Sequence, residues 1–177
     1  MNELFFVDIL NVDRDLKFKI RNWRNDDDVR TYMLTQHFIS QEEHLRWLNS
    51  LKVNERQKFW IVFCGEIPIG AVYLQNINQN ERVSEWGFYI GEKDYRGKGL
   101  GKRILYKLLL EYFESMKFET LITIVLSRNI TALKIYEKFY FRKKEASVTS
   151  DNQEYIKLEF TKKDWLKHKK ELSDACL

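Results

Sequence analysis

Residues 84–112, SEWGFYIGEKDYRGKGLGKRILYKLLLEY, decide how the rest of this chain is interpreted. The stretch alternates like a strand, then carries Gly97, Gly99 and Gly101 among basic residues, and continues as an amphipathic helix from Leu100. Glycines let a backbone approach a ligand closely, and the first amides of a helix have no partner within the helix. Together with the helix dipole, these features predict a phosphate site at the head of this helix.

The spacing of the glycines excludes two common phosphate sites. A P-loop would need a glycine where Arg96 stands and a hydroxyl residue where Arg103 stands. A dinucleotide-binding fingerprint, counted from either of the first two glycines, would place its third glycine at Lys102 or Ile104. The phosphate site is therefore of another kind.

The remaining pattern, Arg96-x-x-Gly99-x-Gly101 between a strand and a helix, resembles the acetyl-CoA motif of the GCN5-related N-acetyltransferases (GNAT family). In that family the amides of this loop hold the pyrophosphate of acetyl-CoA. The resemblance implies acetyl-CoA as co-substrate and these cofactor-binding residues: Arg96, Gly97, Lys98, Gly99, Leu100, Gly101 and Lys102. The alternative is a solvated glycine-rich turn.

A second motif follows downstream, and it also resembles the acetyltransferase family. Helical spacing places Asn129, Ala132 and Tyr136 on one face. The resemblance implies that Asn129 and Lys138 contact the cofactor and that Tyr136 is the general acid, whose hydroxyl protonates the departing CoA thiolate. The alternative for Tyr136 is a tyrosine packed on the sheet. The family usually has glycine where Tyr140 stands, so the turn out of the helix could differ.

The strand before the loop supplies candidates for the reaction itself. In the family, backbone N–H groups of this strand bind the acetyl oxygen and pantetheine, which implies Phe88, Tyr89 and Ile90 here. Alternation places Glu85, Gly87 and Tyr89 on one face. A carboxylate on so apolar a strand loses part of its hydration, which suits a general base acting directly or through water. The alternative is a solvent-facing or salt-bridged Glu85.

The acceptor side is expected in the N-terminal helices. Residues 23–25 (WRN), 32–33 (YM), 38–40 (FIS) and 42–46 (EEHLR) are similar to a narrower subgroup, which acetylates UDP-4-amino sugars in pseudaminic acid biosynthesis for flagellin glycosylation. The similarity spans nearly the whole chain. It implies the 4-amino group of UDP-4-amino-4,6-dideoxy-N-acetyl-beta-L-altrosamine as acceptor.

Such an acceptor needs cations for its diphosphate and an apolar wall for its base and deoxy sugar. The predicted substrate-binding residues are Trp23, Arg24, Arg30, Met33 and His44. The arginines could instead be surface charges, and His44 could be a general base or a helix-surface residue. A protein N-terminus or a small amine is the alternative acceptor, and a CoA-binding module without activity is the alternative to an enzyme.

Composition bounds these hypotheses. A chain of 177 residues suggests one domain over residues 1–177. A net charge of +4 suits an anionic ligand but does not argue for nucleic acid. The two cysteines, Cys64 and Cys176, have no metal-binding spacing, so we expect no metal. We find no signal peptide or membrane-spanning stretch and expect a cytoplasmic protein with no membrane partner. The oligomeric state stays open, with a homodimer as one option.

Periodicity predicts the order of the elements. Strands are expected at residues 3–10, 59–63, 67–74, 83–90, 120–126, 141–149 and 154–160, and helical segments at 13–35, from 40, from 100 and at 129–139. Residues 162–177 predict a basic helix or a tail, with a solvated charged face. This order indicates an α/β fold with a single mixed, mostly antiparallel central sheet flanked by helices. The family resemblance adds splayed strands at the acetyl-CoA site.

Overall fold

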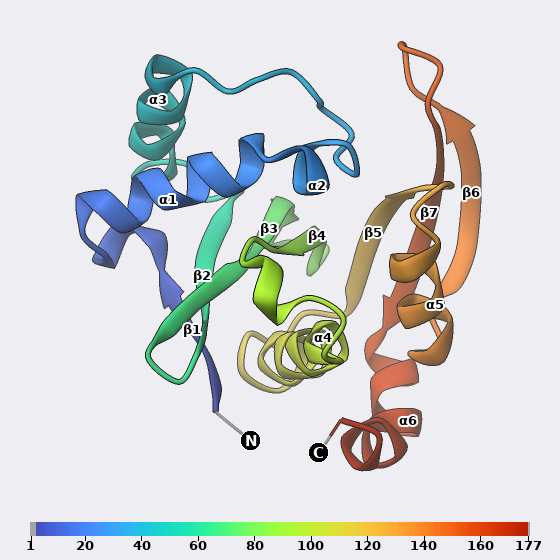
Figure 1. Ribbon diagram of the computed structural model, residues 1–177. Coiled ribbons are helices and arrows are strands. Elements are labelled where there is room, and N and C mark those ends of the chain that lie inside the picture. Colours follow the sequence, from blue (N-terminus) through green and yellow to red (C-terminus); the bar gives the residue numbers. More distant parts are fainter. Residues whose placement is uncertain (1–2, 177) are drawn as a thin grey trace. The chain divides into compact units, whose positions relative to one another are not determined.

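Seven strands form one sheet in the order β1-β2-β3-β4-β5-β7-β6 in the computed structural model, which describes residues 3–176 (Figure 1). The strands are β1 Leu4–Asp8, β2 Lys58–Cys64, β3 Ile67–Asn78, β4 Val83–Ile90, β5 Thr120–Leu126, β6 Arg142–Val148 and β7 Glu154–Thr161. The pair β4–β5 is parallel, whereas β1–β2, β2–β3, β5–β7 and β6–β7 are antiparallel. The expected mixed, mostly antiparallel sheet is confirmed.

Six α-helices accompany the sheet within the described residues: α1 Arg14–Asn25, α2 Asp27–Arg30, α3 Gln41–Leu51, α4 Leu100–Leu110, α5 Ile130–Lys138 and α6 Lys162–Asp174. Short 3-10 turns occur at Ile9–Asn11 (η1) and Lys93–Tyr95 (η2), and a π-helical turn, Glu111–Ser115 (η3), continues α4. Ser40 and Glu43, three residues apart, form a capping box that begins α3. Across residues 3–176, every helix is too short or too polar to cross a bilayer.

The chain divides into two compact units, each with its own core. The first contains the chain up to Asn76 together with Gly87–Lys98, and the second contains Ile77–Trp86 and the chain from Gly99 onward. The expectation of a single domain over residues 1–177 stays a prediction.

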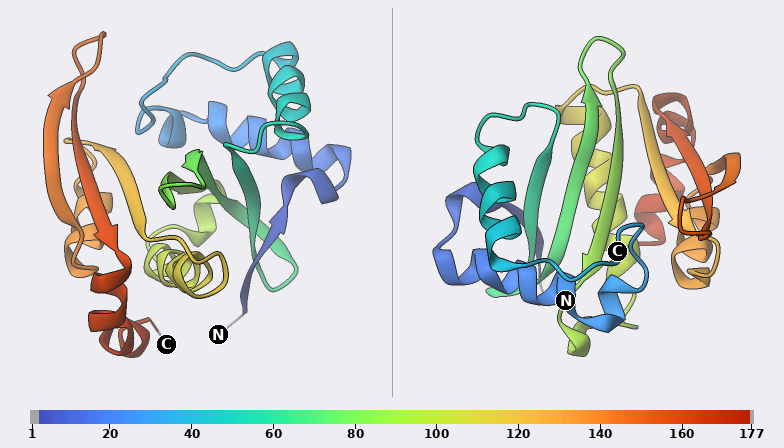
Figure 2. Two further views of the ribbon diagram at one scale, coloured as in Figure 1. Left: turned by 180° about the vertical axis from the view of Figure 1, so that it is seen from behind. Right: turned by 90° about the horizontal axis from the view of Figure 1, so that it is seen from above.

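The first unit packs α1, α2 and α3 with the first strands (Figure 2). The apolar positions of α1 recur at helical spacing, so one stripe of the helix is buried while its charged face stays exposed. The buried cluster consists of Ile9, Ile20, Trp23, Val29, Leu48, Ile61, Ala71 and Tyr89. Two residues predicted to contact ligands, Trp23 and Tyr89, are therefore core residues.

The second unit is built around α4, whose apolar face is completely buried through Ile104, Leu105, Leu108 and Leu109. The C-terminal segment is an ordered amphipathic helix and not a tail, because Trp165 and Leu172 of α6 are only 1% and 2% exposed. The Trp165 indole N–H donates to Glu114 Oε1 at 2.7 Å, which ties α6 to the end of α4. The basic residues of α6 lie on its exposed side, as expected for a solvated face.

The parallel ladder between β4 and β5 is short. It covers three pairs, which join Val83 to Thr120, Ser84 to Leu121 and Glu85 to Ile122. Beyond the last pair, β4 continues to Ile90 and β5 continues to Leu126. The ladder therefore covers only the first three residues of β4, and the expectation of splayed strands stays a prediction.

The turn out of α5 keeps a left-handed residue although it lacks the glycine usual in the family. Tyr140 has φ +63°, a conformation that costs energy in a residue with a Cβ. Its ring stacks on His168 of α6 with centroids 3.8 Å apart, and its hydroxyl donates to Glu171. The tyrosine therefore keeps the left-handed turn and adds contacts that glycine could not make.

Candidate active site

The loop between β4 and α4 leaves its backbone accessible. Gly97 has φ +73° and Gly99 has φ +76°, both in the left-handed region that favours glycine. A Cβ added to either glycine would meet no heavy atom within 4 Å. Open space on this side of the backbone is what a ligand held by loop amides requires.

The N-terminus of α4 also lacks a side-chain cap. The other five α-helices of residues 3–176 begin with an Asp, Ser, Asn or Thr whose side chain accepts a bond from a first-turn amide. In α4 the N-cap is Gly99, which has no side chain to do so. The Lys102 amide donates to the Gly99 carbonyl at 3.2 Å, which leaves the amides of Leu100 and Gly101 available to an anion. The helix dipole favours an anion there.

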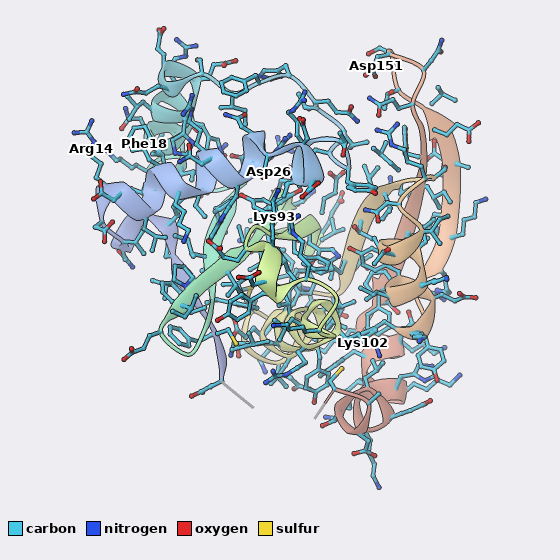
Figure 3. The ribbon with its side chains drawn as sticks, in the orientation of Figure 1. Arg14, Phe18, Asp26, Lys93, Lys102 and Asp151 are labelled. Carbon is cyan, nitrogen blue, oxygen red and sulfur yellow. The ribbon has the colours of Figure 1, made fainter. Side chains whose placement is uncertain are left out.

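The remaining predicted loop residues anchor or flank this backbone. Leu100 and Gly101 are buried at the start of α4, so they fix the helix in the second unit. Lys98 is exposed, with its ammonium 5.7 Å from the centroid of the Tyr95 ring. Lys102, labelled in Figure 3, is partly exposed. Both lysines can supply positive charge to a pyrophosphate.

Arg96, the first residue of the motif, uses its side chain within the protein. Nε donates to the Ile90 carbonyl, Nη2 to the Gly91 carbonyl and Nη1 to Asp28, each at 2.9 Å. In this conformation the guanidinium shapes the start of the loop. The Arg96 amide also donates within the protein, to the Lys93 carbonyl at 3.1 Å, so a contact of Arg96 with the cofactor stays a prediction.

The end of β4 is crowded on both sides. A Cβ on Gly87 would lie 2.3 Å from the Tyr73 hydroxyl oxygen, and a Cβ on Gly70 would lie 2.1 Å from the Tyr89 carbonyl oxygen. At Gly70 the close atom belongs to the backbone, so this position requires glycine, whereas at Gly87 a side chain would have to displace the Tyr73 phenol. The close packing fixes the backbone of Phe88, Tyr89 and Ile90, whose amides stay the predicted contacts of the acetyl oxygen and pantetheine.

Glu85, the predicted general base, is partly exposed and occupies the last β4 position that pairs with β5. The expected alternation holds around it, because the neighbouring side chains Ser84 and Trp86 are buried. Its role as a base stays a proposal.

Tyr136, the predicted general acid, is buried in the second unit and only 3% exposed. Its ring meets the rings of Trp86 and Phe141 edge-on. Thr123 Oγ1 of β5 lies 3.4 Å from the Tyr136 hydroxyl and 3.3 Å from the Trp86 carbonyl oxygen, and its single proton serves one of them at a time. Thr123, which sequence reasoning missed because it stands within an ordinary β-branched strand, therefore helps to hold the phenol.

The other two predicted contacts on α5 differ in character. Asn129 is the N-cap of α5, and its Oδ1 accepts a bond from the Ala132 amide at 3.1 Å. Its side-chain carbonyl is thus occupied in beginning the helix, which leaves the Nδ2 group as the proposed cofactor contact. Lys138 is exposed in the last turn of α5.

On the acceptor side, Arg24 stands out. One guanidinium nitrogen, Nη2, donates to the Thr35 carbonyl, whereas Nη1 is buried without a hydrogen-bond partner. The Tyr89 hydroxyl is also buried without a partner. Burial lowers the pKa of Arg24 and raises the pKa of Tyr89, while the Tyr73 phenol beside Arg24 partly offsets the effect of burial on Arg24. A buried cationic N–H without an acceptor is costly unless a ligand completes it.

The other predicted acceptor-side residues have structural partners. Arg30 donates to the Gln36 carbonyl at 2.7 Å and to Asp27 within its own turn. Met33 packs against the core cluster of the first unit. The role of Arg30 as a diphosphate ligand would require it to leave both partners.

Trp23 and His44 likewise serve the fold. The Trp23 indole N–H donates to Glu92 at 3.2 Å, and its ring leaves no room for a Cβ on Gly91. His44 is 3% exposed, and its Nε2 lies 2.8 Å from the Lys17 carbonyl oxygen. Burial lowers the pKa of His44, so the imidazole is neutral near pH 7 and does not supply a cation.

The described residues contain no group of three His, Cys, Asp or Glu side chains that could hold a metal ion. The structure offers an accessible helix N-terminus with flanking lysines, which can hold a pyrophosphate. It also holds a buried phenol on α5, Tyr136, whose role as general acid stays a proposal.

The fold and this loop define an acetyltransferase. The chain matches the acetyltransferase (GNAT) domain family over residues 10–142 and belongs to it. As a member, it transfers the acetyl group of acetyl-CoA, and the uncapped head of α4 fits the pyrophosphate of that co-substrate.

Two kinds of relatives share this family. The acetyltransferase PseH of Campylobacter jejuni is 32% identical over 136 residues, which cover 77% of this chain and 81% of PseH. The spermine/spermidine N(1)-acetyltransferase of Bacillus subtilis is 37% identical over 129 residues, which cover 66% of this chain and 83% of that enzyme.

Solved structures show the same fold. Spermidine N-acetyltransferase from Vibrio cholerae, in complex with CoA and spermine, matches with a TM-score of 0.83 at 20% identity, covering 92% of this chain and 98% of that one. Campylobacter jejuni PseH in complex with acetyl coenzyme A matches with a TM-score of 0.68 at 23% identity, covering 90% and 99%.

Replacing Gly99 by alanine tests the open loop. Both Gly99→Ala and Gly65→Ala place a Cβ on a residue of positive φ, so each should cost about 1 kcal/mol of stability. Only Gly99 begins α4, so only Gly99→Ala should also weaken acetyl-CoA binding, by about tenfold or more. Thermal denaturation and calorimetric titration with CoA measure the two effects. Equal CoA affinity in both variants would contradict the assignment of this loop.

Proposed function

We propose that the acceptor is the 4-amino group of a UDP-linked 4-amino-4,6-dideoxy-N-acetyl sugar, which would place the enzyme in pseudaminic acid biosynthesis. The observation that carries the proposal is Arg24, whose Nη1 is buried without an acceptor. A diphosphate oxygen would complete that donor with a charge-assisted hydrogen bond. The similarity to PseH supports the same acceptor class.

A polyamine is the other acceptor that the relatives suggest. A polycation needs unpaired carboxylates, whereas five acidic residues near α2, α3 and the turn after β4 lie in ion pairs. Asp26, Asp27, Asp28, Glu42 and Glu92 pair with Lys93, Arg30, Arg96, Arg46 and Lys19, respectively. A polyamine would have to displace these cations, and it would be repelled by Arg24.

The reaction follows from acetyl transfer to an amine. The neutral amine attacks the thioester carbonyl carbon, the carbon–sulfur bond breaks, and the amine loses one proton to a base. Glu85 is our candidate for that base, directly or through water. Tyr136 is our candidate for the acid that gives a proton to the CoA thiolate. Amides at the end of β4 would stabilise the developing negative charge on the carbonyl oxygen.

Arg24→Ala tests the acceptor. With the UDP-4-amino sugar and acetyl-CoA, we expect the KM for the sugar to rise about tenfold or more, because a charged hydrogen bond is lost, while the KM for acetyl-CoA stays unchanged. Arg46→Ala, an exposed arginine on α3 paired only within its helix, is the matched control and should change neither value. Preferred turnover of spermidine, with Arg24→Ala active toward it, would contradict a sugar nucleotide acceptor and favour the polyamine.

Tyr136→Phe tests the general acid. Loss of the phenol proton should lower kcat about 100-fold, since positioned acids contribute at least that factor, with little change in the KM for acetyl-CoA. Tyr106→Phe is the control, because Tyr106 contacts Trp165 through its ring. Steady-state release of CoA thiol measures both variants. Full turnover by Tyr136→Phe across the pH range would refute the assignment.

A further inference from the structure

Arg96 and its three hydrogen-bond partners form a cluster that we call the clasp. The clasp holds the start of the acetyl-CoA loop. The three bonds of Arg96, to the carbonyls of Ile90 and Gly91 and to Asp28, were described above. The two carbonyl bonds fold the side chain back on the end of its own strand. The third bond reaches a residue 68 positions earlier in the chain, at the start of α2. The short segment from Ile90 to Arg96 is therefore closed into a compact turn whose geometry depends on α2.

Lys93 strengthens this clasp from the same turn. Its ammonium lies 3.1 Å from Asp28 Oδ2 and 3.4 Å from Asp26 Oδ2, and Asp26 and Lys93 lie close together in Figure 3. The contact with Lys93, followed by that with Arg96, holds the pKa of Asp28 below its ordinary value, so the carboxylate is ionised at neutral pH. Asp28 thus bridges both basic residues of the turn.

A second set of contacts, from α1, holds the neighbouring residues Gly91 and Glu92. Glu92 accepts a bond from the Trp23 indole and forms an ion pair with Lys19 at 2.7 Å. Gly91 lies so close to the Trp23 ring that an added Cβ would be 2.2 Å from it. Helices α1 and α2 therefore hold the turn at two separate places, through apolar contact and through charge.

We propose that Asp28 is a positioning residue for acetyl-CoA binding, which fixes Arg96 and thereby the entry of the glycine loop. The loop after Arg96 contains two glycines in left-handed conformations, which are costly to order. Fixing its first residue lowers that cost before the cofactor arrives. Since Asp28 belongs to the segment that carries the acceptor-side residues, it also links that segment to the donor loop.

The direction in which Asp28→Asn changes CoA affinity distinguishes a positioning role from a purely electrostatic one. Asp28→Asn removes a negative charge near an anionic cofactor, so electrostatics alone would tighten CoA binding. The clasp predicts the opposite, a CoA dissociation constant raised about threefold or more, the scale of a lost exposed ion pair. Asp27→Asn is the matched control, because Asp27 is the adjacent carboxylate of α2 and pairs with Arg30. It should leave CoA affinity equal or slightly tighter.

The experiment is calorimetric titration of the whole protein with CoA, which needs no acceptor and is therefore independent of the proposed sugar substrate. Asp28→Glu should restore most of the affinity, and thermal denaturation should show all three variants folded. In steady state, Asp28→Asn should raise the KM for acetyl-CoA while kcat at saturation stays near the parent value. Unchanged or tighter CoA binding by Asp28→Asn, or an equal loss in Asp27→Asn, would overturn the proposal.

Discussion

The uncapped N-terminus of α4 is the constraint on which the rest of the structure depends. Every other α-helix of residues 3–176 begins with a side chain that satisfies its first amides, whereas α4 begins at Gly99. A helix that leaves these amides to a ligand must be held in place by other means. Here α4 is held by its completely buried apolar face and by the contact of α6 with the following turn.

The need to hold the uncapped helix and its loop in place explains why several predicted ligand residues contact protein groups instead. Arg96 and Trp23, two of these predicted residues, order the turn that enters the loop, and their side chains contact Asp28 and Glu92. A loop of glycines binds through its backbone, so its affinity depends on neighbours that reduce its freedom. Arg24 differs from these residues, because one of its buried nitrogens has no acceptor.

Much of the fold could be predicted from sequence, because the hydrophobic periodicity and the positions of glycines and cap residues indicate the same element boundaries. The boundaries of β4 and β5, the capping box at Ser40 and the start of α4 follow from alternation, cap residues and glycines. The side-chain partners could not be predicted. Asp28 was interpretable only as a cap-forming residue, since its bond to Arg96 joins segments 68 residues apart. His44 was predicted to bind the substrate because histidine is often a ligand. Tertiary packing buries the ring and lowers its pKa, which the sequence alone does not show.

Hydrogen–deuterium exchange with and without acetyl-CoA tests the central claim most directly, because exchange reports the amides themselves. If the head of α4 holds the pyrophosphate, the amides of Gly97 to Arg103 should become strongly protected at saturating acetyl-CoA. The N-termini of α3 and α6, which already have side-chain caps, should change little and serve as internal references. Unchanged exchange at residues 97–103 in a protein saturated with acetyl-CoA would contradict the account.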